Sequence, residues 1–286
     1  MSIENKNEKI SFRESIGVKR QTQQILDTIN FELQRSTKRF LILTGVIIIF
    51  IALTNIIVYF LEKTFPIEWT SINFLTNYFN VSFLGLIILV LAITYGGKML
   101  VADFHEFTRN ILFPKISRGR LMTGRMIANY IMIVAQITFY YVVWAIITFI
   151  RFEKVPNSLW LSFMGALLYG FMLLSYVVFF SSFMKSSAIS IVISLVIWII
   201  ALPIIMQILS LLIKMEPLFL PNYYGTFIGG ALNMPKDRFL LIEVPDIITV
   251  KTWLTPTTFG AIIGMSGFSA AFLDFAYWIY LNRQNK

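Results

Sequence analysis

The chain has 286 residues, of which 57% are hydrophobic and only 14% are charged, and its mean hydropathy is +0.74. A soluble domain is nearer to half apolar and a quarter charged, so this composition excludes an ordinary soluble protein. The formal charge is +9, but the basic residues stand beside apolar runs, a pattern that sets membrane orientation and does not indicate a nucleic-acid partner. The absence of cysteine excludes disulfides and thiolate metal sites.

Residues 1–39 are predicted to form a cytoplasmic N-terminal segment that begins with a polar stretch. From about Ser15, apolar residues recur at helical spacing, with Val18, Ile25 and Leu33 on one face and charged residues opposite. Such a stripe is typical of an amphipathic elbow helix that lies on the membrane surface. No cleavable signal peptide is expected, because this segment contains no apolar core.

Residues 40–286 are predicted to form one all-α, polytopic membrane domain. Its apolar runs reach the roughly 20 residues that cross a bilayer as a helix. Six transmembrane helices are expected, at residues 40–61, 79–101, 126–150, 158–182, 188–213 and 257–281. Pro203 lies inside the fifth span, where we expect a kink or a break.

The longest connection is the outer loop 214–256, between the fifth and sixth spans. It contains five prolines and two mostly apolar runs, Tyr223–Leu232 and Phe239–Val244. A loop of this length without secondary structure is unusual. We therefore expect short outer or re-entrant helices in this segment.

Lysine and arginine are unevenly distributed between the two sides of this arrangement. If both termini, Lys185 and residues 98–125, which include the loop 102–120, share one side, that side holds 17 of the 24 basic residues. The side richer in Lys and Arg is the cytoplasmic one. The prediction is a multi-pass protein of the cell membrane with both termini in the cytoplasm.

A polar and strongly basic segment, residues 103–125, separates the second and third spans. Apolar residues recur at roughly helical spacing from Phe104 to Leu112, so one face of a short helix can lie on the membrane. Pro114 should end that helix. Ser117 is placed to cap the next helix, which runs into the membrane.

The same segment carries a family pattern. Its elements, in order, are Glu106, Thr108, Ile111-Leu112-Phe113, Ile116-Ser117-Arg118 and Gly124-Arg125. This order resembles the segment after the second span in type-2 ABC exporter permeases, which runs roughly Glu, Thr-Gly, a Leu-Phe pair, Pro-Val-Ser-Arg and Gly-Lys. Three residues depart from it, since Arg109, Lys115 and Arg125 stand where Gly, Pro and Lys are usual.

In that family the segment is the coupling helix that docks on a separate ATP-hydrolysing subunit. The resemblance implies a dimer of identical or homologous permeases with two ATPase subunits, which carry ATP and magnesium. ATP binding would pull on the coupling segment and switch the spans between inward and outward access. The pathway would lie between protomers, with spans two and five nearest the centre. The coupling residues so implied are Asp103, Glu106, Thr108, Arg109, Lys115, Ser117 and Arg118.

Three polar residues inside the predicted spans are candidates for an intramembrane role. Asp274 in the sixth span lies roughly 13 Å along a helix from Arg283. It would face the interior of a dimer, pair with a cation of the loop, or be reached by water near the interface. Gln136 and Gln207, in the third and fifth spans, are more typical of hydrogen bonds between helices.

Other readings of the sequence stay open at this point. The basic segment alone is equally explained as a topology signal that only orients the protein. A secondary transporter or channel would work without an ATPase but needs coupling ions or a polar pore. An intramembrane enzyme is disfavoured, because His105 is the only histidine and lies in the cytoplasmic loop. The chain is therefore expected to be a transport subunit without its own cofactor or catalytic site.

Overall fold

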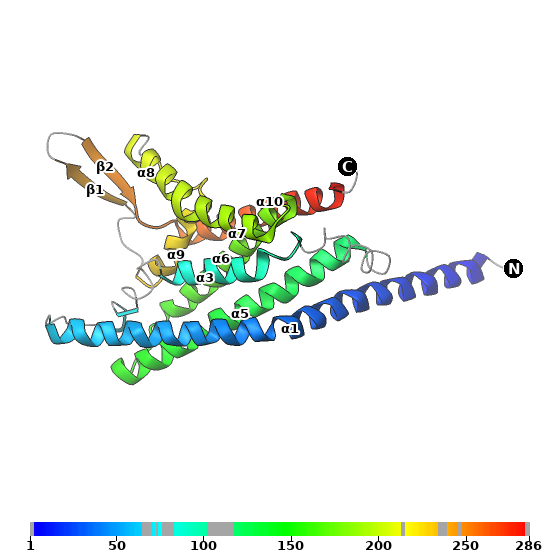
Figure 1. The fold of residues 1–286 in the computed structure, drawn as a ribbon, viewed down its shortest axis with the longest axis horizontal. Coiled ribbons are helices and arrows are strands. Elements are labelled where there is room, and N and C mark those ends of the chain that lie inside the picture. Colours follow the sequence, from blue (N-terminus) through cyan, green and yellow to red (C-terminus); the bar gives the residue numbers. More distant parts are fainter. Residues whose placement is uncertain are drawn as a thin grey trace.

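The fold, taken from a computed structural model, is predominantly helical (Figure 1). The structure describes residues 3–64, 70–72, 74–75, 83–101, 117–212, 215–233, 239–244 and 248–283. Its longest helices are α1 (Ile3–Thr64), α5 (Arg118–Phe152), α6 (Ser158–Phe183) and α10 (Thr258–Asn282). The fifth predicted span is divided into α7 (Ser187–Val196), the π-helical turn η2 (Ile197–Ala201) and α8 (Leu202–Leu212).

Five stretches in the described part of the chain are long and apolar enough to cross a membrane. They are Gln21–Ile57, Arg118–Phe152, Ser158–Phe183, Ser187–Leu209 and Thr258–Asn282, which overlap the predicted first, third, fourth, fifth and sixth spans. Their outer faces expose large apolar side chains, such as Ile42, Ile150 and Phe259. Lipid can cover these side chains but water cannot do so favourably. A helical, multi-pass membrane protein is thereby confirmed in its coarse outline.

The second predicted span differs from the other five. Its helix, α3 (Phe83–Gly96), has 14 residues, which is about 21 Å at 1.5 Å per residue. That is shorter than the roughly 30 Å hydrocarbon core of a bilayer. Ile88 and Ala92 have no exposed surface, because α3 is apolar on all sides and packs against α6 and α5. Six full-length spans are therefore not seen within the described residues.

The N-terminal segment and the first span form one continuous helix, α1, and no separate elbow helix is seen. The polar residues Thr28, Glu32 and Ser36 are buried, on a helix that packs along α5. The nearby apolar residues Leu26 and Phe31 are exposed. The polar stripe of this segment thus faces another helix, where its side chains find partners that the sequence pattern does not reveal.

The fifth span contains a π-helical turn immediately before Pro203, where the sequence predicts a kink or a break. The N–H of Leu202 bonds to the carbonyl of Ile197, five residues earlier, which is the pattern of a π turn. Proline has no N–H to continue the helical ladder, and its ring clashes with the preceding turn. The wider η2 turn accommodates Pro203 without ending the span.

The outer loop is partly as predicted and partly different. Short helices do form, namely the 3-10 turn η3 (Pro221–Gly225) and α9 (Thr226–Gly230). The second apolar run, however, is a strand, β1 (Phe239–Val244), paired antiparallel with β2 (Ile248–Trp253). This corrects the expectation of a helix there. The physical reason is that these runs are rich in Ile, Val and Thr, whose branched side chains favour strands.

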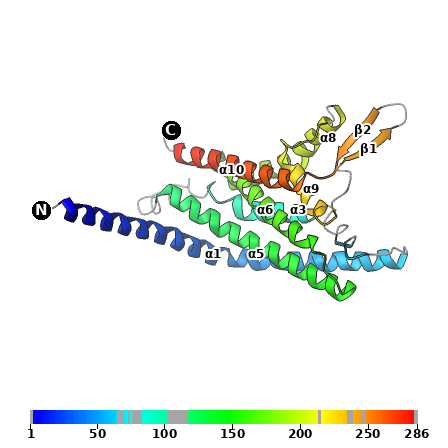
Figure 2. The same ribbon diagram turned by 180° about the vertical axis from the view of Figure 1, so that it is seen from behind.

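The elements alternate in direction along one axis, and both chain ends lie at the same end of the bundle (Figures 1 and 2). In both views α1 runs along α5, and the β1–β2 hairpin lies at the end away from the termini. α10 packs extensively on α6. We call the end with the termini the terminal end, and the end with α9 and the hairpin the loop end.

Candidate functional site

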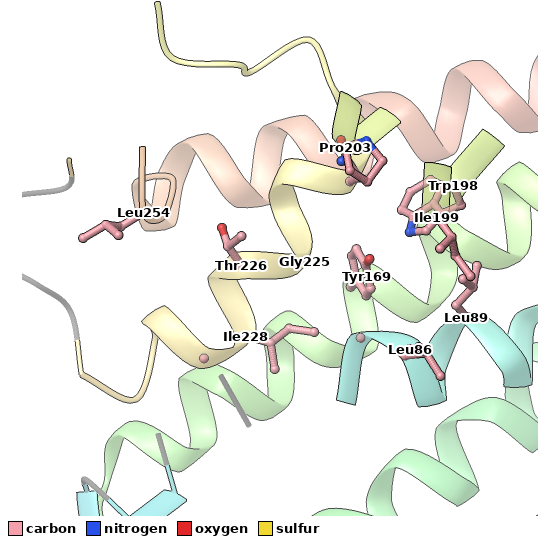
Figure 3. A pocket seen from close by; sticks show the side chains of 13 residues that line it. Leu86, Leu89, Tyr169, Trp198, Ile199, Pro203, Gly225, Thr226, Ile228 and Leu254 are labelled. Carbon is pink, nitrogen blue, oxygen red and sulfur yellow. The ribbon is translucent and has the colours of Figure 1, made fainter. Parts of the chain in front are cut away.

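A cavity of about 320 Å³ lies at the loop end of the bundle. Its walls come from four parts of the chain: α3, α6, the π turn with Pro203 in the fifth span, and the η3–α9 segment together with Leu254, which follows β2. The lining residues are Gly85, Leu86, Leu89, Tyr169, Trp198, Ile199, Pro203, Asn222, Gly225, Thr226, Ile228, Gly229 and Leu254. Figure 3 shows Tyr169, Trp198 and Thr226 placed around the same space.

Tyr169 of α6 is the central side chain of this cavity. It is 3% exposed, and its ring lies edge-on to that of Trp198, with 6.3 Å between the centroids. A Cβ atom placed on Gly225 would come within 2.8 Å of the Tyr169 hydroxyl oxygen, and one on Gly85 would lie 4.0 Å from it. Glycine at position 225 therefore lets the η3–α9 segment approach the tyrosine closely.

The η3–α9 segment is fixed to the bundle by polar and apolar contacts. The Ser162 hydroxyl donates to the carbonyl of Ile228 at 2.7 Å, and the Tyr141 hydroxyl lies 2.8 Å from the Ser162 oxygen. Phe227 packs against α6 at Gly165, where a Cβ atom would meet its ring at 2.8 Å. These contacts hold α9 in place beside the cavity, although it belongs to a connecting loop.

The chemistry of the cavity suits the binding of a largely apolar molecule. Its walls are mostly aliphatic and aromatic, and Asn222 adds a buried Oδ1 atom without a hydrogen-bond partner. No carboxylate, histidine or cysteine is among its lining residues. Within the described residues there is also no group of three or more potential metal-ligating side chains. Such a site fits an apolar or amphipathic molecule with one polar group.

A charged joint lies at the opposite end of α3. We define the joint as Glu32 of α1, Met99 just after α3, and Arg125 of α5. The Nε atom of Arg125 lies 3.0 Å from the Glu32 carboxylate. The Nη1 atom of the same guanidinium donates a hydrogen bond to the Met99 carbonyl at 2.9 Å. The side chains of Arg125 and Glu32 are only 5% and 10% exposed. One arginine thus ties three segments together in a largely buried setting.

The backbone beside the joint is closely packed. A Cβ atom on Gly124 would lie 2.8 Å from Cβ of Thr28 and 3.2 Å from the carbonyl oxygen of Ile25. The neighbouring Leu100 N–H donates to the Ser181 hydroxyl of α6 at 3.1 Å. The adjacent residues Gly124 and Arg125 therefore act differently. Gly124 allows α1 to approach α5 closely, and Arg125 forms an ion pair with Glu32 of α1.

The predicted coupling residues lie mostly outside the described part of the chain. This applies to Asp103, Glu106, Thr108, Arg109 and Lys115. Ser117 occupies the N-cap position of α5 with extended backbone, but its side chain makes no capping hydrogen bond. This corrects the predicted cap. Ser117 is exposed, so water can satisfy the first N–H groups of the helix. Arg118 is the first residue of α5 and lines an open depression with Ile25 and Tyr277.

The three intramembrane polar residues fall in different environments. Gln136 is fully buried, and its Nε2 donates to the Phe40 carbonyl of α1 at 3.1 Å, which confirms a hydrogen bond between helices. Gln207 and Asp274 are both exposed in the single chain. Asp274 has no ion pair with any described residue, and neither residue lines the cavity.

Sequence reasoning missed both the cavity and the joint. Nothing in the local pattern singles out Tyr169 or Trp198, because aromatic residues are common in apolar spans. Glu32 looks like one charge among several on an amphipathic helix. The available signals were weak: the Gly225–Gly229 spacing in the outer loop, and the Gly124-Arg125 pair, noted above only as part of a family pattern.

Comparison with known proteins adds no family assignment. The chain matches no model of a known protein family, and no curated protein matches it. Its function has to be inferred from the residues and the geometry described above.

Proposed function

We propose that this chain is the membrane-spanning permease subunit of an ATP-driven ABC exporter. The observation that carries the proposal is the position of α3 between the cavity and the joint. Leu86 and Leu89 line the cavity, and Met99 lies in the joint. Leu86 and the end of the helix at Gly96 are about 15 Å apart at 1.5 Å per residue. A short helix that packs against α5 and α6 can transmit a displacement of one of its ends to the other end.

The segment that resembles a coupling helix begins directly after this joint. Residues 102–116 connect Val101, at the end of the α3 segment, to Ser117, at the start of α5. A partner that moved this segment would act on a backbone fixed by Arg125 and by Ser181. Rigid attachment at the joint means that such a movement shifts α3 and with it one wall of the cavity.

The cavity supports a transport role for the second and fifth spans. Its walls include α3 and the break at Trp198–Pro203, the two spans that the family resemblance places nearest the pathway. A second permease copy, identical or homologous, would complete the pathway. The cargo that fits these walls is apolar or amphipathic. ATP and magnesium would be held by the separate ATPase, so this chain would not itself be an enzyme.

The alternative, a secondary transporter or channel independent of an ATPase, is less well supported. Coupling to an ion would require an ionisable residue where the transported molecule binds. The one clear candidate, Asp274, lies on an exposed face of α10 and does not line the cavity.

The orientation belongs to the same proposal. The N- and C-termini lie at the same end as the start of α5, and we assign that end to the cytoplasmic face of the cell membrane, where the excess of basic residues favours it. The first part of α1 is proposed to meet that face.

The test is capture of the cognate ATPase by the purified permease. Glu106→Lys should sharply reduce capture, because placing like charges across an interface can cost several kcal/mol. The matched control is Lys63→Glu, an exposed position in the last turn of α1, at the other end of the bundle, which should leave capture intact. Equal capture by the wild type and both variants would reduce the segment to a topology signal.

A further inference from the structure

A narrow cleft opens beside the joint, between α1, the end of α3 and α5. Its lining residues are Glu32, Arg35, Arg39, Tyr95, Lys98, Met99, Arg125 and Asn129. The enclosed space is only about 20 Å³, enough for a group the size of a water molecule. A ligand would therefore place a few atoms in the cleft and the rest outside it.

The charges around this cleft are unbalanced. Four cationic side chains, Arg35, Arg39, Lys98 and Arg125, face one carboxylate, Glu32. That carboxylate is already paired with Arg125 at 3.0 Å and lies 3.6 Å from Arg35. Arg39 and Lys98 form no ion pair with any described residue. Counting the described residues alone, the cleft carries an excess of positive charge that an anion would neutralise.

Tyr95 adds a polar group to the wall of the cleft. Its side chain is 1% exposed, and its hydroxyl has no hydrogen bond of good geometry to any described residue, although it interacts with the neighbouring Gln136. A buried polar group without a partner is costly unless water or a ligand satisfies it. A bound anion with several oxygens would accept from the Tyr95 hydroxyl and from the cations at the rim.

The surface next to the cleft is apolar and continuous. On α1, Arg35 and Arg39 are followed at helical spacing by a stripe of aliphatic side chains. These are Ile42, Val46, Ile49, Leu53 and Ile56, each between 52% and 67% exposed. From Arg39 to Leu53 the stripe is about 21 Å long, which exceeds the roughly 15 Å of one leaflet's hydrocarbon. The charges stand where the apolar run begins, at the level of lipid headgroups.

We propose that this basic cleft binds the phosphate headgroup of an anionic phospholipid, whose acyl chains lie along the aliphatic stripe of α1. The phosphate oxygens enter the cleft between Arg39 and Lys98, and the chains cover Ile42 and Val46. A basic pocket between helices at the cytoplasmic surface is a setting in which lipid headgroups are bound. The lipid bridges α1 and α3 beside the joint and stabilises their contact. This inference does not depend on the ATPase partner.

The test measures lipid retention and thermal unfolding of the full-length protein in nanodiscs. Discs of phosphatidylcholine are compared with discs that contain added phosphatidylglycerol. We expect phosphatidylglycerol to raise the unfolding temperature and to be retained by the wild type. Removing two cations with Arg39→Gln and Lys98→Gln should weaken retention about 30-fold. The matched control, Lys63→Gln with Lys154→Gln, removes the same charge at exposed positions elsewhere and should retain the lipid.

Two results would overturn the proposal. One is equal retention of phosphatidylglycerol by the wild type and the Arg39/Lys98 variant. The other is a stabilisation by inorganic phosphate alone that phosphatidylglycerol does not exceed, which would assign the cleft to a free anion. If the double variant unfolds in phosphatidylcholine, the single change Lys98→Gln, at an exposed position, gives the same comparison with about a fivefold loss.

Discussion

The two ends of α3 are held by different kinds of contact. At the loop end, Leu86 and Leu89 face a cavity whose other walls are aromatic rings, aliphatic chains and glycines. At the terminal end, the chain is fixed by the Arg125–Glu32 ion pair and by hydrogen bonds of the Met99 carbonyl and the Leu100 N–H. Apolar contacts are non-directional, whereas hydrogen bonds lose strength steeply when bent.

This difference indicates where the proposed transport cycle would change the shape of the molecule. The cavity can open or close by sliding apolar surfaces, with little loss of specific bonding. The joint cannot move without separating a buried arginine from its partners. In the proposed function, a force applied at the terminal end would be transmitted through α3, and the loop end is where it would change the cavity volume.

Loss of the central arginine should have the largest effect on stability. Arg125→Met leaves the buried Glu32 carboxylate with only the more exposed Arg35, 3.6 Å away, and removing the closer partner of a buried pair costs up to about 3–5 kcal/mol. Thermal unfolding of the purified protein measures this loss. The double variant Glu32→Gln with Arg125→Met should be more stable than Arg125→Met alone. Lys154→Met, at an exposed position, is the control. An unfolding temperature shared by Arg125→Met and Lys154→Met would show that the pair does not hold the joint.

Gly→Ala substitutions near the two ends of α3 should reduce stability by different amounts. Gly124→Ala would collide with Cβ of Thr28 and the backbone of Ile25, and overpacking of this kind costs about 1–3 kcal/mol. Gly225→Ala meets the far end of the Tyr169 side chain, which can shift, so its cost should be smaller and should fall further with Tyr169→Phe. Gly267→Ala, with nothing within 4 Å, should be neutral or stabilising. A larger loss of stability from Gly225→Ala than from Gly124→Ala would reverse the assignment of rigid and adaptable ends.

Partial filling of the cavity should affect transport more than folding. Leu86 lines the cavity and is 48% exposed, so Leu86→Trp should change stability by no more than about 0.5 kcal/mol. Transport by the reconstituted complex should fall about tenfold, because the larger ring takes up space that the cargo needs. The same substitution at Leu41, 64% exposed on α1, should transport normally. Unchanged transport by Leu86→Trp would remove the cavity from the pathway.

Neutralising the intramembrane acid should have the smallest effect. Asp274→Asn changes a side chain that lies at neither end of α3 and has no ion pair with a described residue. We expect stability to change by about 0.5 kcal/mol or less and transport to stay near the wild-type rate. A strong loss of transport would place Asp274 in the pathway and return support to an ion-coupled transporter.

Much of the helical architecture could be predicted from the sequence because apolar run length depends on local composition alone. Five of the predicted spans overlap helices long enough to cross a membrane, and the interruption next to Pro203 follows from the chemistry of proline. The shortness of α3 was not predicted, because the apolar run 79–101 does not show where the helix ends. The run Phe239–Val244 was predicted to be helical but forms the strand β1, because hydrophobicity alone does not distinguish a short helix from a strand.

The candidate site was harder to predict because it is made by contacts between distant residues. Glu32 and Arg125 are far apart in the sequence, and the residues around each of them do not indicate which residue it pairs with. Tyr169, Gly225 and Trp198 meet only after α6, the outer loop and the fifth span have packed together. The family resemblance pointed to spans two and five, but it carried no information about the residues that line the space between them.

The most direct measurement of the central claim follows the cavity while ATP acts at the other end. The chain has no cysteine, so Thr226→Cys in the cavity wall can carry a single environment-sensitive fluorophore, with Leu41→Cys on the outer face of α1 as control. In complex with the cognate ATPase, ATP and magnesium should change the emission at position 226 and leave that at position 41 unchanged. Adding Glu106→Lys should abolish the change at position 226. A complex that hydrolyses ATP while the emission at position 226 stays constant would contradict the coupling of the two ends.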